Sequence, residues 1–274
     1  MSNQSRFALG VSTDSGRIWT RRSLFLFFKL SLWLCSMSIL LVVITAHALS
    51  IPFASVGMGF AVPPLLFYLI YVEDRRSVSP EDRSNEPVRT ALVTRYSRGL
   101  LITELLALCA YEGVLLYYVF GSPQRSLWFL LLGQVPFVVL SVYDRLKRVP
   151  SGDSLAVGGT WAYVCVFAIV LSTGHELSLP VTVAFLGWLL VVFAGVESRN
   201  VQDAAGDAGA QKTTLSGHLG PERAKVLEVV TKLAGVLVFW VLSGPITAGM
   251  VVGYLLLLRS FRLLTRRAEV LVHE

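Results

Sequence analysis

Long apolar runs recur along the whole chain, and they constrain its fold more than any other feature. A helix needs roughly 17 to 25 mostly apolar residues to cross a bilayer, because each residue rises only ~1.5 Å. Seven runs approach or meet this length, at about residues 24–46, 51–72, 100–120, 127–142, 155–171, 179–196 and 226–242. An eighth run, 246–258, is short, and we expect Arg259 and Arg262 to extend from it towards the membrane surface. The predicted fold is all-α, a polytopic transmembrane helical bundle of about eight spans, with nine as the alternative.

The composition supports a membrane protein rather than a soluble one. Hydrophobic residues make up 54% of the chain, charged residues only 15%, and the mean hydropathy is +0.64. An ordinary soluble domain is about a quarter charged. We therefore expect the lipid bilayer, and no nucleic acid, among its partners. No repeat or linker interrupts the spans, so we predict one domain at 23–264 between an N-terminal segment, 1–22, and a tail, 265–274.

The uneven distribution of Lys and Arg predicts which side each loop faces. In short loops, basic residues stay on the cytoplasmic side. Of the 24 Lys and Arg residues, only Arg125 falls in an alternate loop, and only Lys29 and Lys232 fall within spans. Both termini, and the loops after the second, fourth and sixth spans, are therefore predicted to be cytoplasmic. The first apolar run has full span length and ends without a clear small-residue cleavage site, so we do not interpret it as a signal peptide.

The three cysteines lie within apolar runs. Cys35, Cys109 and Cys165 have no paired spacing and no nearby His. We expect them to be small core residues rather than disulfide partners or zinc ligands.

An acidic segment, 197–215, directly follows the sixth span. Asn200, Asp203 and Asp207 are spaced by three and four residues, which places them on one face of a helix. Gly206 is expected to loosen the backbone, and Lys212 follows. Magnesium prefers oxygen ligands and normally keeps waters and phosphate oxygens in its shell, so it needs few carboxylates from the protein. This pattern suits a magnesium and phosphate site.

A second acidic segment, 73–89, follows the second span. Asp74 and Asp82 would lie about 80° apart around a continuous helix, but the midpoint between them is Val78. We expect the second span to end near Asp74 and a new helix to start at Pro80, because proline is favoured in the first turn of a helix.

The end of this segment places a guanidinium beside the carboxylates. Asn85, Pro87 and Arg89 follow directly, and Arg suits the binding of a diphosphate. The alternative is a solvated loop whose carboxylates offset its arginines.

A basic connector, YDRLKR, follows the fourth span. Tyr143 and Lys147 are one helical turn apart, so a hydroxyl and an ammonium can face the same phosphate. The alternative is the ordinary basic charge of a cytoplasmic loop.

These three segments together resemble the UbiA superfamily of intramembrane prenyltransferases, whose helical bundle carries two aspartate-rich motifs on cytoplasmic loops. Residues 206–224, GDAGAQKTTLSGHLGPERA, are similar to a family pattern. This pattern has a GD pair, then a basic residue before a TL pair, then an LG pair and a later Ala. The connector resembles the family's YTxxKR. The first segment resembles NDxxDxxxD followed by NxPxR, but Asp74 stands where the family usually has Asn and Val78 where it has its central Asp.

The resemblance implies a Mg²⁺-dependent enzyme that moves a prenyl group from an allylic prenyl diphosphate to a lipophilic acceptor. The catalytic carboxylates would be Asp74, Asp82, Asp203 and Asp207, which would bind magnesium together with Asn200. The diphosphate-binding residues would be Asn85, Arg89, Tyr143, Arg145, Lys147 and Lys212. The acceptor stays open among an aromatic or quinone precursor, a glycerol-based lipid, a carotenoid-like polyene and a tetrapyrrole. The prenyl chain length and the oligomeric state also stay open.

Two acidic residues fall inside the third span. An ionisable group at the bilayer centre costs at least ~2.5 kcal/mol on insertion scales. Glu104 lies nearer the cytoplasmic end and is our reserve candidate for contacting the acceptor, whereas Glu112 lies farther out. The structural alternative is that Glu104 pairs with Lys232.

Two other functions are possible. One is a non-catalytic family member that lost the carboxylate at Val78. The other is a transporter, although the paired halves and broken helices typical of transporters are not evident.

Overall fold

Helices make up nearly all of the part of the chain that the structure describes, and the predicted polytopic helical bundle is confirmed. The computed structural model describes residues 27, 30, 32–77, 87–121, 126–209 and 214–273, and no strand occurs within these residues. The first half contains α2 (Leu32–Ala48), α3 (Phe53–Val56), η1 (Gly57–Ala61), α4 (Val62–Arg76), α6 (Pro87–Arg95), α7 (Ser97–Gly121), α8 (Trp128–Gly133) and α9 (Val135–Leu146). The second half contains α10 (Gly152–Thr173), α11 (Leu179–Gly209), α12 (Leu215–Leu219), α13 (Pro221–Ser243) and α14 (Pro245–His273).

Each apolar run of the sequence corresponds to a helix or to consecutive helices: the second run to α3, η1 and α4, the fourth to α8 and α9, and each of the others to one helix. Seven helical segments of the described chain are long and apolar enough to cross a membrane, and α2 is a shorter apolar helix. The second span ends at Arg76, as predicted near Asp74. The three cysteines are free.

The last helix differs from its prediction. The expected short span is wrong, because α14 continues to His273 and its apolar part covers Pro245–Thr265. Arg262, which we expect to extend towards the membrane surface, donates from its Nη2 to the Gly195 carbonyl oxygen at 3.3 Å. This hydrogen bond ties α14 to α11.

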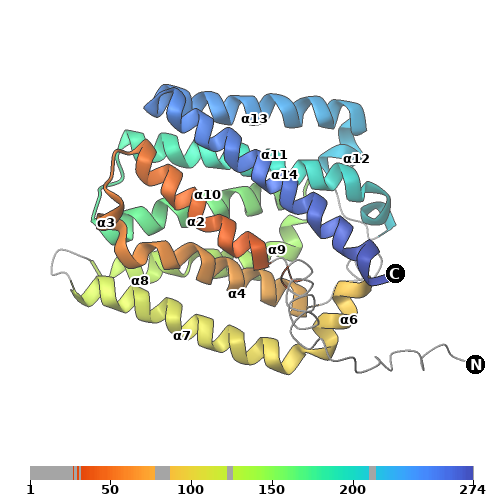
Figure 1. Cartoon of the computed structure of the whole chain (residues 1–274), viewed down its shortest axis with the longest axis horizontal. Coiled ribbons are helices and arrows are strands. Elements are labelled where there is room, and N and C mark those ends of the chain that lie inside the picture. Colours follow the sequence, from red (N-terminus) through yellow and green to blue (C-terminus); the bar gives the residue numbers. More distant parts are fainter. Residues whose placement is uncertain are drawn as a thin grey trace, which may run out of the picture.

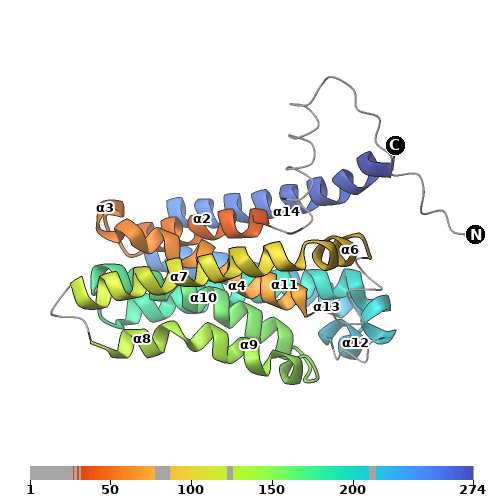
Figure 2. The same ribbon diagram turned by 90° about the horizontal axis from the view of Figure 1, so that it is seen from below.

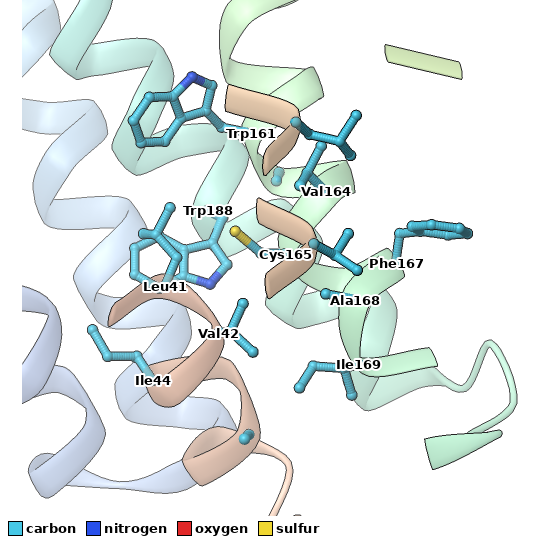
Figure 3. Close-up of a cluster of buried hydrophobic side chains, with 14 of the residues drawn as sticks. Leu41, Val42, Ile44, Trp161, Val164, Cys165, Phe167, Ala168, Ile169 and Trp188 are labelled. Atoms are coloured by element: carbon cyan, nitrogen blue, oxygen red, sulfur yellow. The ribbon is translucent and has the colours of Figure 1, made fainter. Parts of the chain in front are cut away.

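Helix α10 lies at the centre of the bundle. In the most apolar 18-residue stretch of α10, 67% of the residues are buried inside the bundle. In the other six candidate spans this share is at most 39%. It packs against α2, α4, α9 and α11. Figure 3 shows the resulting cluster, in which Leu41 and Val42 of α2 meet Cys165 of α10 and Trp188 of α11. Figure 1 shows the long helices around this core, with α3 at one end of the bundle and α6 and α12 at the other.

Small residues set how closely the helices approach. A Cβ built on Gly235 of α13 would lie 2.6 Å from Val191 Cγ2 and 3.1 Å from the Gly187 carbonyl oxygen, both on α11. Close packing of this kind drives helix association in lipid, where the hydrophobic effect between helices is absent. The α11–α13 pair therefore depends on glycine at this crossing.

A proline breaks the fourth span into α8 and α9. Pro136 has no N–H to donate to the Leu132 carbonyl oxygen, its partner in a regular helix. The Tyr163 hydroxyl of α10 donates to this oxygen instead, at 2.6 Å, and the Tyr111 hydroxyl of α7 donates to the Gly133 carbonyl oxygen at 2.7 Å. Such replacement is required in hydrocarbon, where water does not satisfy freed backbone groups. The two tyrosines hold the break between α7 and α10.

Candidate functional site

Four helices bring polar residues to one end of the bundle. Asp74 stands near the end of α4, Lys147 directly after α9, Asp153 at the start of α10, and Asn200 on α11. Lys147 Nζ lies 3.9 Å from Asp74 Oδ1, and Asn200 Nδ2 lies 3.1 Å from Asp153 Oδ2. Figure 2 shows the end of α9 on the same side of the bundle as α6 and α12. The start of the first acidic segment, the connector and the start of the second acidic segment therefore face one region.

Lys147 is the cation at the centre of this region. Its Nζ lies 4.5 Å from the centroid of the Tyr143 ring and 3.7 Å from Asp144 Oδ1. The Lys147 side chain is only 18% exposed, whereas that of Asp144 is 92% exposed and that of Asp74 is 37% exposed. Lys147 is thus directed inward over Tyr143 towards Asp74, which suits an ammonium that binds phosphate.

A narrow cavity of about 60 Å³ lies beside these residues, between α4, α9 and α10. Asp74 is the charged residue of its lining, and Tyr71, Tyr143 and Thr160 contribute hydroxyl groups. Phe67 and Trp161 are part of its apolar wall, with their ring centroids 4.1 Å apart. The cavity therefore joins a charged end to an aromatic interior. Its polarity matches a molecule with an anionic head and a hydrocarbon tail, but its volume is below the roughly 300 to 1,000 Å³ of ligand sites, so the helices must move apart to admit one.

A network of buried polar side chains connects α10 and α11 next to the cavity. Asn200 Nδ2 donates to Asp153 Oδ2 and to Ser154 Oγ, each at 3.1 Å, and the Ser154 hydroxyl donates to Glu197 Oε1 at 2.6 Å. All four residues are at most 3% exposed. Because Nδ2 is engaged as a donor, the amide oxygen is the atom of Asn200 that suits a cation.

The sequence interpretation missed three members of this network, Asp153, Ser154 and Glu197. Two signals were available in the sequence. Glu197 stands three residues before Asn200, on the same helical face, and Asp153 lies in the first turn of the span after the basic connector. Neither signal reveals that the carboxylates are buried.

A glycine sets the distance between the connector and the start of α10. A Cβ on Gly152 would lie 2.2 Å from the Leu146 carbonyl oxygen, and Ser151 before it adopts a left-handed conformation with φ of 59°. The chain can make this tight turn only if residue 152 has no side chain. The turn places Lys147 and Asp153 at the same site.

Arginines from three helices, Arg75 of α4, Arg89 of α6 and Arg199 of α11, lie near one another and near Asp74. Arg75 and Arg89 are 6% and 7% exposed, and the charges of Arg89 and Arg199 act on Arg75. Arg75 lies 5.2 Å from the centroid of the Tyr71 ring and donates to the Leu30 carbonyl oxygen. Guanidinium groups bind phosphate oxygens readily, so these arginines add positive charge near the Asp74 and Lys147 end of the bundle.

The predicted site residues fall into three groups. The structure brings together Asp74, Tyr143 and Lys147. It places Asn200 in the adjoining network and Arg89 beside Arg75. Arg145 is exposed, and its side chain forms no ion pair within the described part of the chain. The side chains of Asp82, Asn85, Asp203, Asp207 and Lys212 lie outside the described residues, as does the helix expected at Pro80.

Helix α11 carries the second acidic segment. Its backbone continues as a regular helix to Gly209, so Asn200, Asp203 and Asp207 keep the helical spacing predicted for them. The expected loosening at Gly206 is wrong, because the helix runs through it. Among the described side chains, no group of three or more His, Cys, Asp or Glu is placed to hold a metal ion.

The comparisons with known proteins decide the family. A family model described as the UbiA prenyltransferase family matches residues 81–271. The chain belongs to this family. The search of curated proteins and the search of solved structures each gave no match. Membership in the UbiA family supports prenyltransferase activity in general, and together with the apolar helices it supports an integral membrane protein. The matched region includes the connector and the buried network, whereas Asp74 precedes it.

Proposed function

We propose that this protein is a Mg²⁺-dependent intramembrane prenyltransferase that moves a prenyl group from an allylic prenyl diphosphate to a lipophilic acceptor. One observation carries the proposal: Lys147 lies between Asp74 and Tyr143, both of which line an aromatic cavity, in a member of the UbiA family. The excess of basic residues in the same loops supports a cytoplasmic site.

The residues at the site have the chemistry that magnesium requires. Carboxylate and amide oxygens are its preferred protein ligands. Asp74 and Asn200 supply these at the described ends of α4 and α11, and Asp82, Asp203 and Asp207 would complete the set. When bound, Mg²⁺ would offset the negative charge of the departing diphosphate.

The basic side chains would bind and orient the diphosphate. Lys147, Arg89 and Lys212 supply positive charge, and Asn85, Tyr143 and Arg145 would add hydrogen bonds. When the allylic carbon to oxygen bond breaks, its electron pair leaves with the diphosphate, and charge stabilisation of this leaving group lowers the barrier.

The aromatic cavity would protect the reactive carbon. Phe67, Tyr143 and Trp161 present ring faces and edges around it, and ring faces attract a cation. Apolar walls also keep water away from the allylic cation. An electron pair of the acceptor then forms the new bond to carbon, and the acceptor loses a proton.

Two matched substitutions test this function. Asp74 and Asp144 both approach Lys147, but only Asp74 lines the cavity. The purified protein in liposomes that contain a total membrane lipid extract, as the source of the acceptor, is supplied with isotopically labelled allylic diphosphates of several lengths and with magnesium, and diphosphate release is measured. Asp74→Asn is expected to slow release by about 10²-fold, the usual cost of losing a preorganised charged group. Asp144→Asn is expected to leave the rate unchanged, and equal rates for the two variants would contradict the assignment.

A further inference from the structure

A second and larger cavity lies between α4, α7 and the α8–α9 break. Its volume is about 460 Å³, within the range of roughly 300 to 1,000 Å³ that is typical of small-molecule sites. Helix α4 contributes Leu69, Glu73 and Arg76, and α7 contributes Leu101, Glu104, Leu105 and Leu108. Gln134, Phe137 and Leu140 complete the lining.

The polar end of this cavity has an unbalanced set of charges. Arg76 Nη1 donates to Glu73 Oε2, at 3.1 Å, and to Glu104 Oε2. One guanidinium therefore faces two carboxylates. The Nε–H of Arg76 is buried and has no hydrogen-bond partner among the described residues. The Arg76 side chain as a whole is 22% exposed and lines the cavity, so a ligand that accepts a hydrogen bond from its guanidinium and donates one to a carboxylate would fit this polar end.

Glu104 lies in a membrane span, where a carboxylate is costly to keep. Its side chain is 13% exposed, and Arg76 of α4 is its ion-pair partner. The alternative pairing with Lys232 is wrong, because Lys232 donates to Glu228 on its own helix. An ionisable group inside the bilayer marks a functional site by default, since a purely structural contact seldom requires one.

The rest of the cavity is apolar and opens towards the lipid. Leu101 and Leu105 are 40% and 53% exposed on the outer face of α7. Gln134, part of the polar lining, is held in place by a hydrogen bond from its Nε2 to Glu112 Oε1 at 3.0 Å. A lipophilic molecule can therefore enter from the bilayer with its polar group directed at Arg76.

The second cavity adjoins the first. Glu73 and Asp74 are consecutive residues of α4, and they line different cavities. Leu140 of α9 lines both. The two cavities therefore meet at the end of α4 and at Leu140.

We infer that the second cavity binds the prenyl acceptor, and that this acceptor is an uncharged lipophile bearing a hydroxyl group. The inference rests on the proposed prenyltransferase function. A hydroxyl can both accept from the Arg76 guanidinium and donate to Glu73 or Glu104, the charged residues that line the cavity. A carboxylate or phosphate head would meet the excess of negative charge, and a polyene without polar groups would cover these charged side chains without forming a hydrogen bond to them.

Photolabelling tests the inference without requiring turnover. The purified full chain in liposomes is exposed to a diazirine-bearing long-chain alkylphenol, to the matching alkylbenzoate, or to a phosphatidylcholine with a diazirine in its tail. Mass spectrometry then measures labelling of the peptide that contains residues 101–108. The phenol is expected to label this peptide about tenfold more than the benzoate does, because one unfavourable charge contact is worth about that factor.

Charge variants with a matched control test the polar end. Glu104→Gln is expected to reduce phenol labelling about tenfold, as expected for the loss of one charge-assisted hydrogen bond. Glu228→Gln removes a carboxylate of similar exposure, 15% against 13%, from another ion pair within a span. It is expected to leave the labelling unchanged.

A second pair of variants fills the cavity without changing its charge. Leu105→Trp is expected to abolish phenol labelling, because Leu105 lines the cavity. Leu106→Trp is expected to leave it intact, because Leu106 is 64% exposed and does not line the cavity.

Several outcomes would overturn the inference. Equal labelling by the phenol and the benzoate would show that the cavity does not select by charge. Equal loss in Leu105→Trp and Leu106→Trp would place the label elsewhere. If added phosphatidylcholine reduces phenol labelling as much as added phenol without a diazirine does, the occupant of the cavity is bulk lipid. If the protein is labelled selectively by the phenol but releases no diphosphate, the binding site is supported and the prenyltransferase function is contradicted.

Discussion

Gly152→Ala is the substitution whose effect the structure specifies most closely. The added Cβ would lie 2.2 Å from the Leu146 carbonyl oxygen, and ordinary contact begins at 3.4 Å. The backbone at the end of α9 must therefore shift by about 1.2 Å relative to α10. Lys147 follows Leu146 directly, so it moves with the end of α9. Its Nζ already lies 3.9 Å from Asp74 Oδ1, and the shift therefore separates two groups of the proposed diphosphate site.

A displacement of about 1 Å in a positioned group costs roughly 10²-fold in rate. We therefore expect Gly152→Ala to lower the turnover number for magnesium-dependent diphosphate release by about that factor. Overpacking costs about 1 to 3 kcal/mol, so thermal unfolding in detergent is expected to occur at a lower temperature with the fold retained. Initial rates are measured at saturating prenyl diphosphate.

Gly159→Ala is the matched control. Gly159 belongs to the same helix, and a Cβ there meets nothing within 4 Å. Alanine also favours helix formation, so this variant is expected to be as active and at least as stable as the wild-type protein. Equal rates for Gly152→Ala and Gly159→Ala would refute the view that this turn positions Lys147.

Other substitutions test separate parts of the site. Ser154→Ala removes a hydrogen bond to buried Glu197 and is expected to lower the free energy of unfolding by about 2 kcal/mol in thermal or denaturant unfolding. Lys147→Gln is expected to raise KM for the prenyl diphosphate at least about tenfold, whereas Lys225→Gln, which changes a 56% exposed side chain, leaves KM unchanged. Val78→Asp is expected to lower the magnesium concentration needed for half-maximal diphosphate release. Absence of release before and after that change, with no magnesium-dependent diphosphate binding, would favour a scaffold protein.

The positions of the spans were predictable because hydrophobic length is a local property of the sequence. The same reasoning failed at α14, where the apolar run ends near residue 258 but the helix continues to His273. A helix does not stop where the hydrocarbon stops, because its backbone hydrogen bonds also form in water. Hydropathy predicts the apolar part of a helix and not its end.

Contacts between helices were less predictable than the helices themselves. Sequence allowed Glu104 to pair with Lys232, but the structure pairs it with Arg76, since the rotation of each helix about its axis decides which faces meet. The pairing of Tyr143 with Lys147 was predictable because both lie within one turn. Asp153 and Glu197 belong to different helices, so their shared network appears only in the folded bundle.

The decisive measurement is diphosphate release by the wild-type protein and by Asp207→Asn, with and without magnesium, in liposomes that contain a total membrane lipid extract as the source of the acceptor. We expect the wild-type protein to release diphosphate from an allylic prenyl diphosphate only when magnesium is present. We expect Asp207→Asn to abolish the release while the protein stays folded in detergent. Normal turnover by Asp207→Asn would contradict the assignment of α11 as a magnesium-binding helix, and release that is independent of magnesium would contradict the proposed chemistry.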